Sequence, residues 1–179
     1  MGFTVVAVVV GLLVGLAVGG RPRYLSDKPV NRWGLLLVGV VVQLASSHLG
    51  GGFGFFLLLV SYAFLLGFAA SNVQIVGMVL VGLGLMLNLT TIAVNHGMPV
   101  RRSALVRAHI ATRDEVDRLT VASKHHLERR DDTLMAISDI IPVPFLREVL
   151  SFGDLVLSVG VADTMVHLLR PTRKRHSAL

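Results

Sequence analysis

Residues 53–94 read FGFFLLLVSYAFLLGFAASNVQIVGMVLVGLGLMLNLTTIAV and contain no charged side chain. The hydrocarbon core of a bilayer, ~30 Å thick, takes about 20 apolar residues per helical crossing. This stretch is long enough for two crossings, at 53–70 and 73–94, with Ser71 and Asn72 between them. We therefore expect an integral membrane protein.

Three further apolar blocks lie outward from this stretch, at 3–20, 33–48 and 149–169. The block at 33–48 is short and begins with Trp33, an aromatic residue typical of membrane interfaces. Of the 179 residues, 53% are hydrophobic and 16% are charged, whereas ~25% are charged in soluble domains. The sequence predicts an all-α fold, a polytopic transmembrane helical bundle of five spans with a basic tail at 170–179.

Charge and cysteine content exclude several classes of function. The chain has no cysteine, so disulfides and thiolate chemistry are excluded. Its net charge of +6 is not arranged as a basic stripe with interleaved aromatics, so we expect the lipid bilayer and no nucleic acid as its partner. An uncharged N-terminus followed by a basic loop at 21–32 favours an outside N-terminus and a cytoplasmic C-terminus.

The segment 95–148 is water-facing, because it holds nine Lys or Arg and eight Asp or Glu. Thr112 and Glu115 have capping-box spacing, which predicts a helix from Arg113 to about Ser123. The acidic and histidine side chains after it do not have a zinc-binding spacing, so we expect a solvated charged loop and no metal or cofactor. These side chains are His125, His126, Glu128, Asp131 and Asp132.

Polar and small residues recur on one face of the span 73–94, at steps of three and four. This face is either a hydrogen-bonded helix interface or the wall of a polar cavity, and Asn88 should face the first or fifth span. The cavity candidates are Gln74, Asn88, Thr91, Asn95 and His96. A second small-residue pattern, in the first span, indicates either a homodimer seam or packing within the monomer, and consists of Gly11, Gly15 and Gly19.

The last span carries ionisable residues, which in membrane helices usually mark function. Ser151 is placed as the N-cap of this helix, which makes Asp154 its N3 residue. Asp163 and His167 share one face and are candidates for an ion pair or for a proton-coupled carrier.

Four motifs occur in a characteristic order: Asn95-His-Gly-Met-Pro-Val100, Ser123-Lys-His125, Asp139-Ile-Ile-Pro142 and Ser151-Phe-Gly-Asp154. This order resembles a bacterial multi-pass membrane protein family of unknown function, although His96 stands where that family has Gly. The resemblance implies a bacterial cytoplasmic membrane and a polytopic fold, but no activity.

A fainter likeness is to the type II signal peptidases, which process lipoproteins within the membrane. Their last helix opens with an Asn-x-Ala-Asp motif that follows a second catalytic aspartate, and Asp154 and Asp139 stand in similar places. The spacing of the two aspartates and the order of helices differ from that family. The likeness implies that Asp139 and Asp154 are catalytic candidates, one as the base and one as the acid.

Three functions remain open at this point. The sequence favours a non-enzymatic bundle that binds a protein partner or lipid. The alternatives are an intramembrane aspartyl hydrolase that uses Asp139 and Asp154, and a small proton-coupled carrier that uses Asp163.

Overall fold

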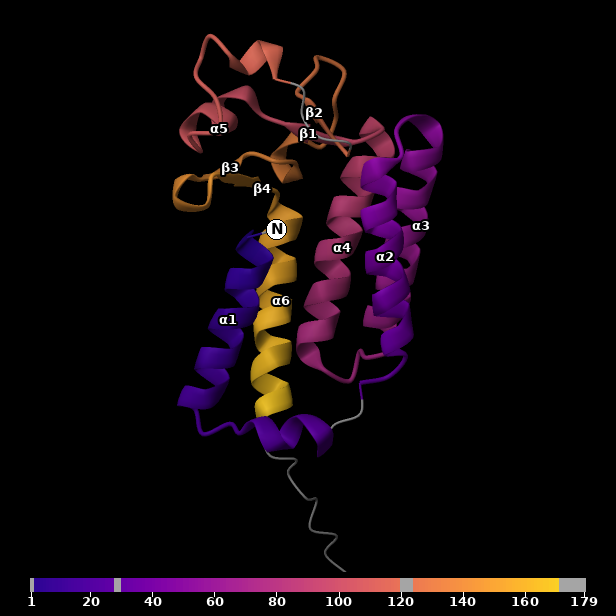
Figure 1. Ribbon diagram of the computed structural model, residues 1–179, viewed down its shortest axis with the longest axis vertical. Helices are drawn as coiled ribbons and strands as arrows, with labels where there is room; N and C mark the ends of the chain where they lie inside the picture. The colour runs from indigo at the N-terminus through magenta and orange to yellow at the C-terminus, as the bar shows by residue number, and fades with distance from the viewer. Residues whose placement is uncertain (1, 28–29, 120–123, 171–179) are drawn as a thin grey trace, which may run out of the picture.

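A computed structural model describes residues 2–27, 30–119 and 124–170 (Figure 1). Five long helices lie side by side as a bundle, and the segment between the fourth and fifth of them covers one end of it. The bundle helices are α1 (Gly2–Ala17), α2 (Trp33–His48), α3 (Gly51–Ala70), α4 (Val76–Asn95) and α6 (Phe152–Leu169). A short 3-10 helix, η1 (Pro22–Asp27), follows α1.

Three of the described helices, α3, α4 and α6, are long and apolar enough to cross a membrane. The other two bundle helices, α1 and α2, are apolar but shorter. Length and composition therefore support three of the five predicted spans.

The helices pack closely where glycines meet. A Cβ added to Gly84 of α4 would lie 2.6 Å from the carbonyl oxygen of Gly153 in α6. On the other side of α6, a Cβ added to Gly11 of α1 would lie 2.7 Å from the carbonyl oxygen of Ala162, and Gly15 faces Leu169. Gly11 and Gly15 thus pack within the monomer, and a homodimer is not needed to explain them.

The segment 98–150, here called the cap, is built from short elements around a small apolar core of Val100, Leu105 and Val116. Strand β1 pairs in parallel with β2, and β3 pairs antiparallel with β4. The elements are β1 (Met98–Val100), α5 (Arg102–Arg107), η2 (Val116–Arg118), β2 (His125–Leu127), η3 (Met135–Ile137), β3 (Ile141–Val143), η4 (Pro144–Leu146) and β4 (Glu148–Leu150).

The cap corrects two predictions. The all-α prediction missed its four strands, because three-residue strands are too short to show a period-2 pattern and are stabilised by partners distant in sequence. The helix predicted from Arg113 is also wrong as far as the chain is described. Thr112 Oγ1 does donate to Glu115 Oε2 over 2.8 Å, but only the 3-10 turn η2 follows, since buried Val116 anchors the chain in the cap core. Residues 120–123 and the basic tail from 171 lie outside the described residues.

Candidate carboxylate site between cap and bundle

The first turn of α6 holds Asp154 in a fixed position. Ser151 Oγ accepts from the backbone N–H of Asp154 at 2.9 Å, and Asp154 Oδ2 accepts from the backbone N–H of Ser151 at 3.1 Å. This reciprocal pair is a capping box, as the spacing of the two residues predicts. The carboxylate is thereby held at the cap end of the bundle.

Asn88 joins α4 to this turn. Its amide nitrogen donates to Asp154 Oδ1 at 2.8 Å, and its amide oxygen accepts from the Ser151 hydroxyl at 2.8 Å. Tyr62 of α3 is buried near the same side chain. The prediction that Asn88 faces the last helix is confirmed, and Gly153 makes the approach possible because a Cβ there would collide with Asn88 Oδ1.

Asp139 enters the same region from the cap. Its backbone N–H donates to Pro99 O at 3.1 Å, and its carbonyl accepts from the Arg101 N–H at 3.0 Å, so the residue is tied to β1. Its side chain is only 7% exposed. Burial, together with the charge of Asp154, raises the pKa of Asp139 to about 8, although nearby Lys124 acts in the opposite direction.

His125 of β2 lies against this carboxyl, with Nε2 3.4 Å from Asp139 Oδ2. Burial and the neighbouring Lys124 charge lower the pKa of His125 to about 4. At neutral pH the contact therefore joins an uncharged imidazole to a protonated carboxyl and is not an ion pair. Among the described residues, no hydrogen bond joins the Asp139 and Asp154 carboxyls, and the two interact through the charge of Asp154.

The expectation of a solvated charged loop holds for Asp131, which is exposed, but is wrong for His125, His126 and Asp132. His125 belongs to the site, and the ring of His126 lies 2.9 Å from Asp132 Oδ1 with both side chains largely buried. Parallel pairing of β2 with β1 places these residues against the bundle end, which local composition could not indicate.

The other polar candidates lie outside the site. Asn95 is hydrogen-bonded to the backbone of Thr133 through both ends of its amide. His96 stacks on Phe55 with ring centroids 5.6 Å apart. Thr91 is buried and donates to Leu87 O, whereas three candidates are exposed, namely Gln74 before α4 and Asp163 and His167 on α6.

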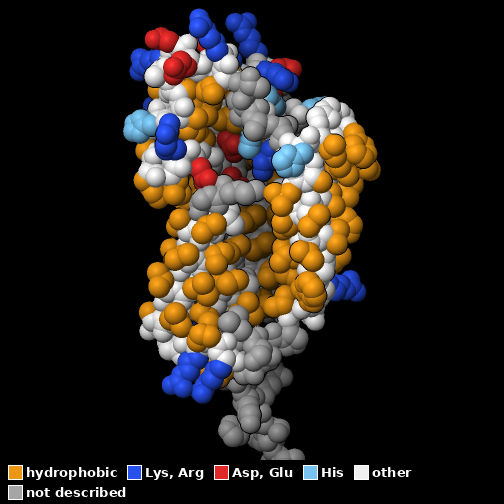
Figure 2. Space-filling model, in the orientation of Figure 1, with side chains coloured by type: hydrophobic (Ala, Val, Ile, Leu, Met, Phe, Trp, Pro, Cys, Tyr) orange, Lys and Arg blue, Asp and Glu red, His pale blue; other side chains and the backbone are white. Residues whose placement is uncertain are grey.

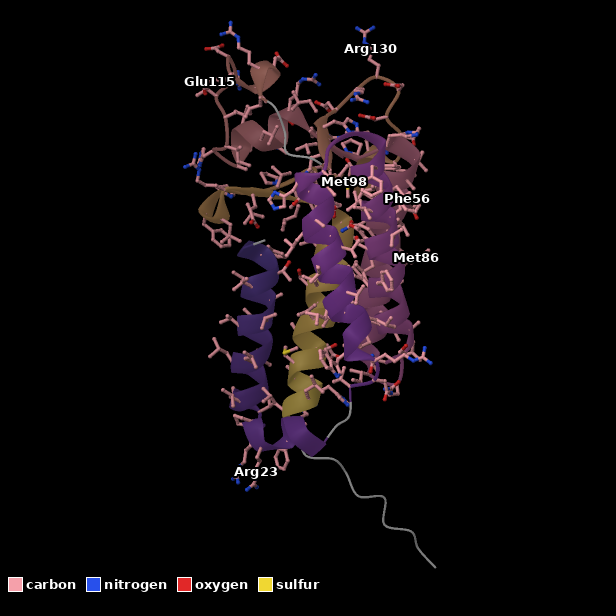
Figure 3. The ribbon with its side chains drawn as sticks, turned by 45° about the vertical axis from the view of Figure 1, so that its right-hand side comes forward. Arg23, Phe56, Met86, Met98, Glu115 and Arg130 are labelled. Atoms are coloured by element: carbon pink, nitrogen blue, oxygen red, sulfur yellow. The ribbon has the colours of Figure 1, made fainter. Side chains whose placement is uncertain are left out.

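Figure 2 shows how charged and apolar side chains are distributed over one face of the molecule. Acidic, basic and histidine side chains gather around a hollow at the level where the cap meets the apolar bundle. Side chains at the tip of the cap, such as Glu115 and Arg130, point away from it, and Met98 marks the junction (Figure 3). The site is thus at the boundary between the apolar part and the charged part of the molecule.

Two contributors were missed from sequence. Tyr62 is 3% exposed within an otherwise apolar span, and its hydroxyl needs a partner there, which was a usable signal. Lys124 carried no such signal, because its effect on Asp139 and His125 arises from the fold of the cap. In chemical terms, the site combines a buried carboxyl whose pKa is raised, Asp139, with a second aspartate, Asp154, whose charge contributes to that shift and whose position is fixed by its capping box.

Comparisons with known proteins give one match. No curated protein and no solved structure matches the chain. The sequence profile of a family of unknown function, DUF5317, matches residues 29–166, which include most of the bundle and the whole carboxylate site. The protein therefore belongs to the DUF5317 family of unknown function.

Proposed function

We propose that the chain is a multi-pass protein of the bacterial cytoplasmic membrane. In this proposal the helices α1, α2, α3, α4 and α6 each cross the bilayer. In support, α1 lies along α6 and α2 lies along α3 as the chain runs up and down the bundle (Figure 1). Sixteen helical residues extend about 24 Å, which local thinning of a ~30 Å core accommodates. The N-terminus and the cap lie outside, and the C-terminus lies in the cytoplasm.

The activity that the site supports best is hydrolysis by an aspartate pair, the alternative that the sequence placed second. The observation that carries it is geometric: Asp139 is 7% exposed and lies 3.4 Å from His125 Nε2, while the capping box of α6 fixes Asp154 at the same end of the bundle. The raised pKa of Asp139, due to burial and to the Asp154 charge, supports it. Two coupled carboxyls with distinct protonation states can act together as acid and base. The substrate is an amide or ester bond presented at the membrane surface.

In this reaction, Asp154 takes a proton from water while the water oxygen bonds to the substrate carbonyl carbon. Asp139 gives its proton to the carbonyl oxygen, which forms a tetrahedral diol. The diol then returns a proton to Asp139, Asp154 protonates the leaving amine or alcohol, and the bond to the carbonyl carbon breaks. Asn88 and Ser151 hold Asp154 in place throughout.

The test compares membranes of cells that carry the wild type, Asp139→Asn, Asp154→Asn or Asp163→Asn, by quantitative proteomics for cleaved membrane-anchored proteins. We expect cleavage products with the wild type and with Asp163→Asn, whose carboxylate is exposed on the same helix as Asp154. The other two variants should accumulate uncleaved precursors. Asn replaces the neutral form of Asp139, so Asp139→Asn should remain folded, and unchanged cleavage by it would refute the hydrolase.

A specific observation favours the non-enzymatic bundle as the second candidate. The network of Ser151, Asn88 and Asp154 is fully hydrogen-bonded, and it explains these residues as a joint between α4 and the first turn of α6. This candidate predicts that Asp139→Asn has no consequence for any membrane protein, whereas Asp154→Asn lowers the stability of the protein.

A further inference from the structure

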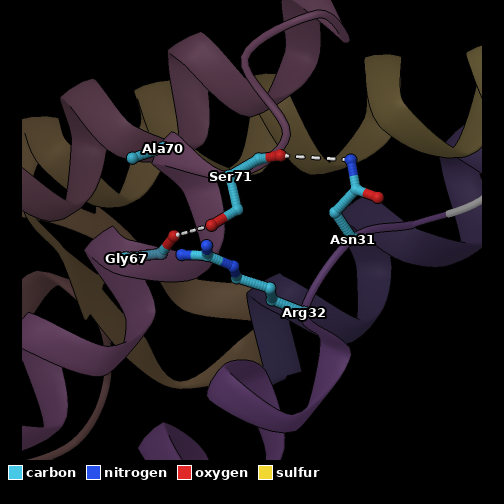
Figure 4. A pocket seen from close by; sticks show the side chains of 5 residues that line it. All are labelled: Asn31, Arg32, Gly67, Ala70 and Ser71. Atoms are coloured by element: carbon cyan, nitrogen blue, oxygen red, sulfur yellow. Dashed lines mark hydrogen bonds between the residues drawn. The ribbon is translucent and has the colours of Figure 1, made fainter.

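The opposite end of the bundle contains a second polar site. A cavity of about 610 Å³ lies between the start of α2 and the end of α3 (Figure 4). It is lined by Asn31, Arg32, Gly67, Ala70 and Ser71. In the topology proposed above, on which this inference rests, the cavity lies where α3, a helix of membrane length, leaves the bilayer.

Most acceptors in the cavity wall already have donors. Gly67 O accepts from both the hydroxyl and the backbone N–H of Ser71, at 2.7 and 3.0 Å. Ser71 O accepts from the Asn31 amide at 3.4 Å. The guanidinium of Arg32, by contrast, has no hydrogen bond or ion pair among the described residues. The cavity wall therefore offers a positive charge and unused N–H hydrogen-bond donors.

The backbone holds Arg32 in this place. Asn31 and Asn72 are joined by two hydrogen bonds, from Asn31 N to Asn72 Oδ1 at 2.8 Å and from Asn72 Nδ2 to Asn31 O at 2.9 Å. Directly after this clamp, Arg32 has φ 53° and ψ 39°, a left-handed conformation that favours glycine. A strained arginine whose side chain lies along an open cavity suggests selection for the guanidinium itself.

We propose that this cavity binds the phosphate group of a membrane phospholipid, with Arg32 as the main contact. A guanidinium presents several N–H donors in a planar fork that matches phosphate oxygens. Arg21, an exposed arginine outside the cavity lining, provides a matched basic residue for comparison. The source of the phosphate is the bilayer, since the cavity lies at its boundary.

The test measures lipid binding to the purified protein by native mass spectrometry. The probes are phosphatidylglycerol, a galactolipid that lacks phosphate, and inorganic phosphate. We expect the wild type to retain phosphatidylglycerol in preference to the galactolipid. The Arg32→Gly variant should bind phosphatidylglycerol at least about ten-fold more weakly, as loss of a charge-assisted hydrogen bond implies. The matched Arg21→Gly variant should bind like the wild type.

A thermal unfolding measurement separates binding from a purely structural role. Glycine adopts the backbone conformation of Arg32 without strain, so Arg32→Gly should unfold at the same or a higher temperature while it loses the lipid. Equal binding by Arg32→Gly, or an equal loss in Arg21→Gly, would overturn the proposal. Equal retention of the galactolipid by the wild type would do so without any variant. Binding of inorganic phosphate without phospholipid would reject the bilayer as the source.

Discussion

Asp139 is the residue whose chemistry depends most on its surroundings. In water an aspartate is ionised at neutral pH, but burial and the Asp154 charge raise the pKa of Asp139 to about 8. Burial has the opposite effect on the pKa of His125, the residue in contact with Asp139, and lowers it. Both shifts favour uncharged forms, which is how an apolar environment accommodates two titratable groups in contact.

The first prediction concerns the pH dependence of Asp139. Infrared difference spectra between the wild type and Asp139→Asn should show the carbonyl stretch of a protonated carboxylic acid at neutral pH. This band should disappear as the pH rises through about 8. Because the folded-state pKa is raised, the stabilisation linked to this proton is complete below about pH 4 and is lost as the pH approaches about 8. Hydrolysis that needs protonated Asp139 as the acid should also fall as the pH rises through about 8. An infrared spectrum that does not change with pH would contradict this account.

A second prediction at this scale concerns Asn88. The Asn88→Leu substitution leaves Asp154 and Ser151 without a shared partner, so we expect the free energy of unfolding to fall by roughly 1–2 kcal/mol, the range for hydrogen bonds within membranes. The measurement is reversible unfolding in mixed micelles. Thr90→Val is the matched control on α4, because Thr90 is exposed and bonds only its own helix. Similar losses in both variants would show that Asn88 has no special role.

At the scale of elements, α4 and α6 form the interface that sets the site. Gly77 and Gly84 of α4 meet Gly160 and Gly153 of α6 with almost no space between the backbones. This close approach brings Asn88 within hydrogen-bonding distance of the first turn of α6. Since lipid is as apolar as the helices, such backbone contact is a main source of their association.

The third prediction tests this interface. An added methyl at Gly84 would lie 2.6 Å from Gly153 O and from Leu157 N, so Gly84→Ala should destabilise the fold by about 1–3 kcal/mol, as overpacking does. Gly82 is on the same helix, and a Cβ there meets only Ala69 at 3.6 Å. Gly82→Ala should therefore be neutral or slightly stabilising in the same unfolding assay. If Gly84→Ala and Gly82→Ala had the same free energy of unfolding, α4 and α6 would be able to move apart without a loss of stability.

At the scale of the whole molecule, hydrogen bonds between described residues attach the cap to the bundle. Glu148 Oε2 accepts from the backbone N–H of Phe3 at the start of α1. Asn95 at the end of α4 is hydrogen-bonded to the backbone of Thr133. The charge of Asp154 in α6 acts on Asp139 in the cap, so a change in cap position would also change the environment of Asp139.

The fourth prediction concerns orientation in the membrane. Ser123 and Ser177, which the sequence suggests for labelling, lie outside the described residues, so Glu115 and Arg21 serve instead. Glu115 is exposed on the cap, and Arg21 is exposed at the opposite end of the bundle. An impermeant maleimide should label Glu115→Cys in intact cells and should not label Arg21→Cys. The reverse pattern would invert the proposed topology and would place the carboxylate site in the cytoplasm.

The sequence by itself determined those features that depend on neighbouring residues. Long uncharged blocks predict helices because a helix satisfies its own backbone hydrogen bonds, and α2 covers the same residues as its block. The Ser151 and Asp154 capping box was also predictable, since its two members are three residues apart. The polar face of α4 predicted that Asn88 faces the first or the fifth span, because an amide in lipid needs a partner, and its partner is Asp154 of α6.

Only the tertiary structure decided how the cap is built and what it does to Asp139. The strands of the cap are three residues long, and β1 pairs with β2 from 27 positions further along, so no local pattern could reveal them. The chain after Thr112 did not form the predicted helix because Val116 is buried in the cap core. The pKa of Asp139 depends on burial and on its separation from Asp154 and Lys124, which are distances through space that sequence spacing does not encode.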